Sequence, residues 1–440
     1  MTQQKHLKRL VRARMEKTGE SYATARRHVI RTAPTRPADP ATRWHFPGNV
    51  PATTALRVLL AHAGVRDPHT GEPFSEPMLF GIAGGIGIGV FSFFYEKANH
   101  ASFFVAGRHE WQDDLGYLQH ACERFGLKPM VRESSGTKPA EKHLREALAT
   151  GPCVAWVDMA HLPHRAMPAT HSGGGYHVVV VYKADETNAT IGDLTDQPIE
   201  IPLTNLSEAR ARIKKQKNRV LSVTGPAKTP NLQTLIRSGL DACVKKLKSP
   251  SMKVARGNFQ LDALKTWADR LHGSKDKERW ERVFARGANL WRGLTGMHHW
   301  IEYYGTGGGL CRPLFADFFT EAAAVMKDPQ LSALANQYAD LGRQWTELAD
   351  AALPDGVPMF REAKALIARK AELLVSEGPA AADEIRGVWD RGGELERQAA
   401  DSFPLSDSQC ADLRASLKAR VLALHQGEIA TLAAVADAMS

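Results

Sequence analysis

The hydrophobic pattern is clearest at a glycine turn, 173–175, that is followed by the β-branched run 178–181. Such a run is typical of a strand buried on both faces. After a polar turn, a second short strand at 190–192 ends at Asp193. Because neighbouring antiparallel strands hold residues side by side, we expect His177, at the start of the first strand, to lie next to Asp193.

Helical and extended patterns alternate on both sides of these strands. Apolar residues at helical spacing predict four helices, and short apolar runs predict further strands. The predicted helices are 52–62, 111–125, 139–150 and 203–219, and the predicted strands are 101–105, 128–132, 153–158 and 220–223. A helix followed by a mainly antiparallel sheet that carries a histidine and an acid indicates a papain-like α+β domain at 44–223.

The second half of the chain, 224–440, is helical in pattern throughout. Leu232, Leu235, Ile236 and Leu240 illustrate the apolar stripe of a helical bundle. The predicted helices are 231–248, 257–272, 277–297, 313–326, 328–351, 359–377, 380–403 and 406–438. We therefore expect an all-α domain after the α+β domain.

The first 32 residues form a basic extension with a helix, a break at 18–21 and a second helix at 22–30. Residues 1–36 hold ten Lys or Arg against two Glu, which is nearly the whole formal charge of +9. Two such short helices cannot make a core alone, so we expect them to dock on the main body, a partner or an anionic polymer. The Pro-rich stretch 33–43 is typical of a linker.

Composition excludes several classes. Beyond the extension the chain is close to neutral, so its main body is not an obvious nucleic-acid binder. The five cysteines form no CxxC pair and are odd in number, which argues against a disulfide framework or zinc cluster. No apolar signal segment opens the chain. We expect a cytoplasmic protein without metal or cofactor.

A run of glycines at positions 81, 84, 85, 87 and 89 invites a phosphate-loop interpretation, which the pattern does not support. No Lys-Ser/Thr follows, and the spacing does not fit GxGxxG. The uncharged stretch 77–95 is only marginally long enough for a membrane span, and its glycines disfavour one. We expect a buried turn where backbone passes close to backbone, with Gly84 and Gly85 bordering a ligand cleft.

Several polar residues surround the predicted strands. A carboxylate beside an imidazole can orient it for acid/base work, so His177 and Asp193 are candidate catalytic residues. Asp158, at the end of a buried strand, and Tyr176 are candidate substrate contacts, and a structural role is an equal alternative for Asp158. The nearby histidines match no zinc signature; they are His161, His164 and His171.

The helical half contains one stretch rich in aromatic and polar residues, 298–312. It joins two histidines, a carboxylate, a glycine turn and an arginine between helices. One interpretation is a packed interhelical corner. The other is a corner that closes over the N-terminal cleft and shapes a pocket, with Glu302 and Arg312 as its polar contacts.

Four segments in the first half together resemble the N-terminal domain of butirosin biosynthesis protein H, an acyltransferase family with a papain-like arrangement. They are 48–60 (GNVPATTALRVLL), 75–81 (SEPMLFG), Val157-Asp158 with Leu162-Pro163, and 176–180 (YHVVV) ahead of Gly192-Asp193. The second half resembles the helical domain of unknown function that commonly follows this family. Its marker is 307–319 (GGGLCRPLFADFF).

The resemblance implies a thioester-handling enzyme. The member for which the family is named moves an aminoacyl group from a carrier protein to an aminoglycoside amine. A cysteine near the start of the first helix would be the nucleophile, His177 the base and Asp193 its orienter. This sequence has Val50-Pro51 where the family pattern has His-Cys, and no cysteine precedes Cys122.

Three interpretations follow from that departure. The domain has lost covalent catalysis and serves as a binding or scaffolding module. Alternatively, His177 deprotonates an amine while the glycine turn or the helix N-terminus stabilises an oxyanion, without a covalent step. In the third, Thr53, Thr54 or Cys153 replaces the nucleophile.

We therefore expect an acyltransferase-like protein of natural-product or peptide modification, with a non-catalytic binding or assembly module as the alternative. The expected partners are an acyl carrier protein, or a peptide or small-molecule acceptor. The extension 1–36 would recruit an anionic partner such as a carrier protein, a peptide or a nucleic acid. No membrane partner is expected, and a homo-oligomer is compatible with the sequence.

Overall fold

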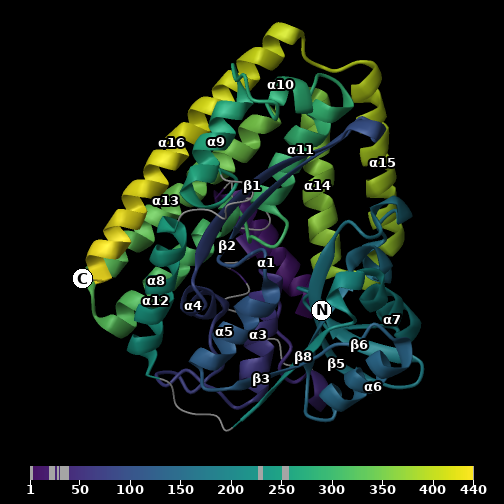
Figure 1. Ribbon diagram of the computed structural model, residues 1–440, viewed down its shortest axis with the longest axis vertical. Helices are drawn as coiled ribbons and strands as arrows, with labels where there is room; N and C mark the ends of the chain where they lie inside the picture. The colour runs from purple at the N-terminus through teal and green to yellow at the C-terminus, as the bar shows by residue number, and fades with distance from the viewer. Residues whose placement is uncertain are drawn as a thin grey trace. The chain divides into compact units, whose positions relative to one another are not determined.

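The computed structural model describes residues 3–18, 25–26, 29, 39–225, 231–249 and 257–439 (Figure 1). The chain divides into two compact units. Unit 1 comprises Met1–Leu79, Gln112–Leu235 and Arg369–Trp389, and unit 2 comprises Phe80–Trp111, Ile236–Ala368 and Asp390–Ser440. Each unit thus takes segments from both predicted domains. The domain boundaries predicted from the sequence are not tested by this division and stay a prediction.

Unit 1 is built on a six-stranded sheet in which every pair of neighbouring strands is antiparallel. Its order is β3-β8-β4-β5-β6-β7. The strands are β3 (Lys128–Arg132), β4 (Cys153–Asp158), β5 (Tyr176–Ala184), β6 (Asn188–Gly192), β7 (Ile199–Pro202) and β8 (Val220–Thr224). All six residues of β4 are buried, as its apolar sequence requires of a central strand.

One face of this sheet carries the core of unit 1. Val157, Val179, Val181 and Ile191 pack there in a single cluster with apolar side chains of α6 (Thr137–Leu148) and α7 (Leu203–Arg212). The helix predicted at 203–219 ends at Arg212 and is followed by the 3-10 helix η6 (Lys214–Gln216).

Two further helices, α3 (Pro51–His62) and α5 (Asp114–Arg124), pack against each other, and α3 also packs against β5. Proline occupies the first turn of α3, where its missing N–H costs nothing. The glycine run begins within α4 (Glu76–Ile82).

The N-terminal extension is docked within unit 1. Its first helix, α1 (Gln3–Thr18), places Val11 in a small buried cluster with Ala25 and Val29. Most of the predicted second helix, 22–30, and most of the predicted linker, 33–43, lie outside the described residues. The end of that linker forms the 3-10 helix η1 (Pro40–Thr42), capped by Asp39.

Unit 2 combines a hairpin with helices. The hairpin joins β1 (Ile86–Tyr95) to β2 (His100–Arg108). Helices that lie wholly or partly in this unit are α8 (Leu232–Lys248), α9 (Gln260–Leu271), α10 (Trp280–Val283), α11 (Ala288–Glu302), α12 (Arg312–Met326), α13 (Pro329–Ala352), α14 (Pro358–Ser376), α15 (Ala382–Asp401) and α16 (Asp407–Met439).

Two predictions in this unit need correction. The helix predicted at 277–297 is two helices, α10 and α11, because Gly287 adopts φ 114° before α11 begins. The glycine run is partly the strand β1 rather than turn alone. At Gly87 a Cβ would lie 2.4 Å from the Arg108 carbonyl oxygen, and at Gly89 it would lie 2.2 Å from the Trp111 ring. Close approach of backbone and of a ring therefore requires these glycines.

A search of the described helices for a stretch both long and apolar enough to cross a membrane finds none.

His45 connects the segment before α3 to the sheet. Its Nδ1 lies 3.0 Å from the Tyr182 hydroxyl and its Nε2 lies 2.9 Å from the Thr195 carbonyl oxygen. Burial, opposed by the bond to Thr195 and reinforced by the charge of Arg26, lowers the pKa of His45 to about 4. The imidazole is therefore neutral in the folded protein at neutral pH.

Because the folded-state pKa of His45 lies below its unfolded value, the unfolded chain binds a proton first on acidification. The stabilisation is complete above about pH 6.5 and is lost as the pH falls toward 4. Between pH 7 and pH 5 the His45→Gln variant should lose about 2 kcal/mol less unfolding free energy than the unsubstituted protein. Urea denaturation at both pH values measures this, and equal losses would contradict it.

Candidate active site

The hydrogen-bond register of β5 and β6 brings His177 to Asp193. Val180 lies opposite Gly192, so Asp193, the next residue, falls one step along β5, on the same face as His177. The His177 Nε2 lies 2.5 Å from the Asp193 Oδ1, and both side chains are buried. The neighbourhood predicted from the strand pattern is present, while the catalytic role of the pair stays a prediction.

Asp193 is shared among three partners rather than reserved for His177. Arg165 donates from Nε and from one terminal nitrogen to the two carboxylate oxygens, each at 2.8 Å. His164 Nε2 lies 2.8 Å from Oδ2. Both residues come from the 3-10 helix η4 (Pro163–Arg165).

Electrostatics hold Asp193 ionised. Burial by itself would raise the pKa of this carboxyl, but the charges of Arg165 and His177 and the hydrogen bonds from His164 and His177 hold it well below its ordinary value. Burial lowers the pKa of His164, against the influence of Asp193. His164 therefore binds as a neutral imidazole that donates from Nε2.

The sequence pattern presents His164 only as a possible metal ligand and assigns no role to Arg165. Burying Asp193 demands a counter-charge, which predicts that a cation is near without saying which one. Among the described residues, no group of three or more His, Cys, Asp or Glu side chains is arranged to hold a metal ion.

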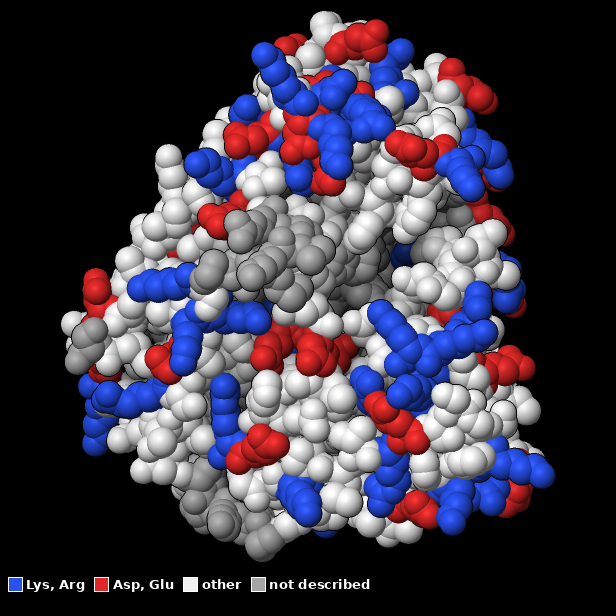
Figure 2. Space-filling view, viewed as in Figure 1, with Lys and Arg blue, Asp and Glu red and all other residues white. Residues whose placement is uncertain are grey.

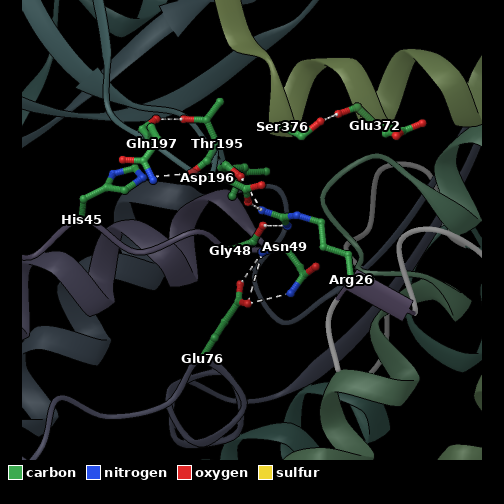
Figure 3. Close-up of polar contacts among 11 residues, drawn as sticks. Arg26, His45, Gly48, Asn49, Glu76, Thr195, Asp196, Gln197, Glu372 and Ser376 are labelled. Atoms are coloured by element: carbon green, nitrogen blue, oxygen red, sulfur yellow. Dashed lines mark hydrogen bonds and ion pairs between the residues drawn. The ribbon is translucent and has the colours of Figure 1, made fainter. Parts of the chain in front are cut away.

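The N-terminus of α3, where the sequence lacks the expected cysteine, is occupied by a carboxylate (Figure 3). Glu76 accepts hydrogen bonds from the backbone N–H of Asn49 at 2.9 Å and of Val50 at 2.8 Å, and from the Asn49 side chain at 2.9 Å. Val50 offers no side-chain cap, so the helix takes its acceptor from α4. That need was the only signal in the sequence, and it does not identify Glu76.

Neither threonine predicted as a nucleophile is bonded to His177. Thr53 is fully buried, and its hydroxyl lies 2.8 Å from the Tyr117 hydroxyl. Thr54 donates to Glu76 at 3.2 Å. Cys153 is also buried, and that burial raises the pKa of its thiol to about 12.

Asp158 serves the loop that follows β4. Its two oxygens accept from the backbone N–H of Ala160 at 3.0 Å and of Gly173 at 2.6 Å, and the residue is fully buried. These bonds fix the loop at both ends, which favours the structural alternative. Tyr176 pairs with Asp158 across the sheet and is half-buried beneath Lys215, whose Nζ lies 5.2 Å from its ring. Their roles toward a substrate stay predictions.

The remaining predicted contacts belong to unit 2. Gly84 and Gly85 have φ 111° and 63°, and a Cβ there would lie 2.4 Å from the His109 ring and 2.5 Å from the Phe315 ring, respectively. At these two glycines the backbone therefore passes close to side-chain rings, whereas the sequence predicts an approach of backbone to backbone. That they border a ligand cleft stays a prediction.

Glu302 and Arg312 are both buried and bind other parts of unit 2. Glu302 accepts from the Gly309 N–H at 3.1 Å and the Thr346 hydroxyl at 2.7 Å. Arg312 is fully buried and donates to Glu428 at 2.6 Å. Their positions favour the packed-corner interpretation, and their proposed substrate contacts are untested.

A buried cluster around Arg26 joins the N-terminal extension to the start of α3 and to the loop after Asp193 (Figure 3). Arg26 donates to the Gly48 carbonyl at 3.1 Å, just before α3, and to the Leu194 carbonyl at 3.2 Å, just after Asp193. It also forms a 2.7 Å ion pair with Asp196, and both side chains are almost fully buried. The sequence leaves open whether the extension that carries Arg26 docks on the main body, a partner or an anionic polymer, and the structure places this residue in the interior of unit 1.

Comparison with protein families gives two matches. Residues 51–194 match the family described as butirosin biosynthesis protein H, N-terminal. Residues 204–374 match a domain of unknown function, DUF4872. No curated protein matches the chain.

Removing Arg26 should destabilise unit 1 strongly, because it leaves the Asp196 charge buried without a partner. We expect Arg26→Met to lower the free energy of unfolding by about 3–5 kcal/mol, and Arg26→Met with Asp196→Asn to lower it less. The control is Arg12→Met, which breaks the exposed 2.7 Å pair with Glu372 and should cost at most about 1 kcal/mol. Equal effects of Arg26→Met and Arg12→Met in chemical denaturation would contradict the assignment.

Proposed function

The chain carries a domain of the butirosin biosynthesis protein H family followed by a DUF4872 domain, and from this we propose a non-catalytic, acyltransferase-like protein that forms no covalent acyl-enzyme. In this proposal the domain has a papain-like arrangement. It binds an acyl or peptide ligand in natural-product or peptide modification, and acts as a binding or assembly module.

The observation that carries the proposal is the Glu76 carboxylate at the N-terminus of α3. In a thiol enzyme this helix end favours a thiolate or an oxyanion through its N–H groups and its dipole. Here Glu76 already accepts from the Val50 N–H, and Pro51 has neither a nucleophilic side chain nor an N–H. A second negative charge at this place would be disfavoured by repulsion.

Other nucleophiles are poorly placed for the same reaction. All five cysteines are buried, and burial raises the pKa of Cys122, Cys153 and Cys243 to about 12. The Thr53 and Thr54 hydroxyls are engaged by Tyr117 and Glu76. A covalent intermediate on any of these side chains would require them to leave their present partners.

The papain-like arrangement is supported by topology. An antiparallel sheet carries His177 at the start of a central strand, and the preceding helix α3 packs on that same strand. The guanidinium of Arg26 contacts the chain just before α3 and just after Asp193. The start of α3 and the Asp193 loop therefore lie within reach of one side chain.

A second candidate function is acyl or amide chemistry by general base catalysis alone. The contact between His177 and Asp193 favours it, because a carboxylate bonded to Nε2 would leave Nδ1 as the basic nitrogen of a neutral ring. Two observations weigh against it. Arg165 takes both oxygens of the same carboxylate, and the helix N-terminus that was expected to stabilise an oxyanion is bonded to Glu76.

An acyl carrier protein or an acidic peptide remains the proposed partner. Basic side chains gather over the part of unit 1 that contains β5, β6, α6 and α7 (Figure 2). This surface can attract such a partner in a salt-dependent way. The extension is less suited to the task than its charge suggests, since Arg12 and Arg26 pair with Glu372 and Asp196.

Incubation with an aminoacyl thioester should leave the intact mass of the protein unchanged. The unsubstituted protein should release thiol from this thioester no faster than the His177→Ala variant does. A covalent adduct on the unsubstituted protein would overturn the proposal, and turnover that depends on His177 without an adduct would favour the second candidate.

The matched gain-of-function variant combines Pro51→Cys with Glu76→Gln, which supplies the thiol and removes the competing charge. We expect it to gain the mass of one acyl group, and adding His177→Ala should slow that acylation about 100-fold. Pro51→Cys alone serves as the control, and it should react more slowly than the double variant because Glu76 still disfavours a thiolate there.

A further inference from the structure

Lys370, in the part of α14 that belongs to unit 1, lies against an aromatic ring beside the loop that carries Arg165. Its Nζ lies 3.6 Å from the centre of the Trp389 ring. The Trp389 indole N–H donates to the Arg165 carbonyl at 3.4 Å, and the His171 ring lies 5.0 Å from the indole. Lys370 is half-buried at this position.

Lys370 makes no ion pair or hydrogen bond with any residue in the described part of the chain. Three carboxylates on the surrounding elements of unit 1 already have cationic partners. Glu372 pairs with Arg12 and Arg369, and Glu384 pairs with Arg369. Asp193 is taken by Arg165 and the two histidines, as described above.

The charge that acts on this ammonium is that of Arg165. Arg165 comes from η4, and His171, from η5 (Ala169–His171), lies on the same Trp389 ring as Lys370. Burial, and then the charge of Arg165, lower the pKa of Lys370 to about 8. A cation that is partly desolvated, near a second cation and without a counter-ion, is destabilised unless an anion joins it.

We propose that Lys370, together with the adjacent Arg165, binds the oxyanion of a small ligand, either a carboxylate or a phosphate group. The site is anchored by Trp389, whose ring holds the ammonium while its indole N–H holds the backbone of Arg165. This inference goes beyond the proposed function. It holds whether or not the family domain transfers acyl groups.

The surroundings favour an anion on an organic molecule. Leu374, Val388 and Trp389 are only partly buried and pack on the small cluster formed by Leu373, Ala381 and Ile385. Apolar surface beside an ammonium that has no counter-ion among the described residues suits a ligand with an apolar body and one charged end. The same ammonium would bind a carboxylate or a phosphate, so the experiment includes one probe for each.

The test uses the full chain and measures how fast the Lys370 amine is acetylated by limiting acetic anhydride at pH values from 6 to 10. Peptide mass spectrometry gives the extent of acetylation at each pH. The probes are sodium acetate and sodium sulfate, with sodium chloride at equal ionic strength. Without the probes, acetylation should be half-maximal near pH 8. With acetate for a carboxylate site, or sulfate for a phosphate site, the midpoint should rise by about one pH unit, and acetylation at pH 8 should slow several-fold.

Lys364, earlier in α14, is the internal control because its Nζ already lies 2.6 Å from Asp355. Its acetylation should not respond to either probe beyond the effect of chloride. Equal slowing of Lys370 by chloride and by both probes would overturn the proposal. So would acetylation of Lys370 that is no faster at pH 8 than that of exposed lysines.

Thermal unfolding provides a second readout. Lys370→Met keeps an apolar side chain on Trp389 and removes the charge. This variant should therefore have a higher melting temperature than the unsubstituted protein. The anion that stabilises the unsubstituted protein, acetate or sulfate, should not raise the melting temperature of Lys370→Met further. Lys364→Met should retain that stabilisation. Between pH 7 and pH 9 the affinity of the unsubstituted protein for the probe should fall about tenfold, following deprotonation of Lys370. An unchanged response of Lys370→Met to both probes would overturn the proposal.

Discussion

A single buried negative charge, that of Asp193, organises the candidate site. A carboxylate taken out of water needs a counter-charge and several hydrogen bonds, and here one arginine and two histidines supply them. The bonds to Asp193 hold η4 against the end of β6 and fix the orientation of the His164 and His177 rings. The same need limits the chemistry, because a carboxylate bound by Arg165 at both oxygens is not reserved for one imidazole.

A second carboxylate decides the other half of the site. Glu76 fills the N-terminus of α3, and Arg26 joins the chain just before that helix to the Asp193 loop. Pro51 and Glu76 are consistent with each other, because a helix start without a nucleophile can accept a fixed anion at its N–H groups. Together they fit the proposal that this domain acts without a covalent acyl-enzyme.

Arg26 shows why local charge is a poor guide to function. In the sequence it is one of ten basic residues whose charge is compatible with docking on the main body or with recruiting an anionic partner. In the structure it is almost fully buried and paired with Asp196, 170 residues away. Lys370 shows the reverse: its sequence neighbourhood is ordinary, yet the fold places it on the Trp389 ring with no counter-ion among the described residues.

Features that depend on short-range pattern were predictable before the fold was known. The β-branched run and glycine turn predicted β5, the strand ending at Asp193 predicted its neighbour, and their antiparallel pairing placed His177 beside that carboxylate. Apolar spacing predicted the long helices, and the motifs identified the family. The partners of the buried polar groups could be identified only from the fold. Arg165 pairs with Asp193, Asp196 pairs with Arg26, and Glu76 accepts from the N-terminus of α3. The physical reason is that burial dictates the need for a counter-charge or acceptor, whereas which residue meets it depends on how segments far apart in the chain pack together.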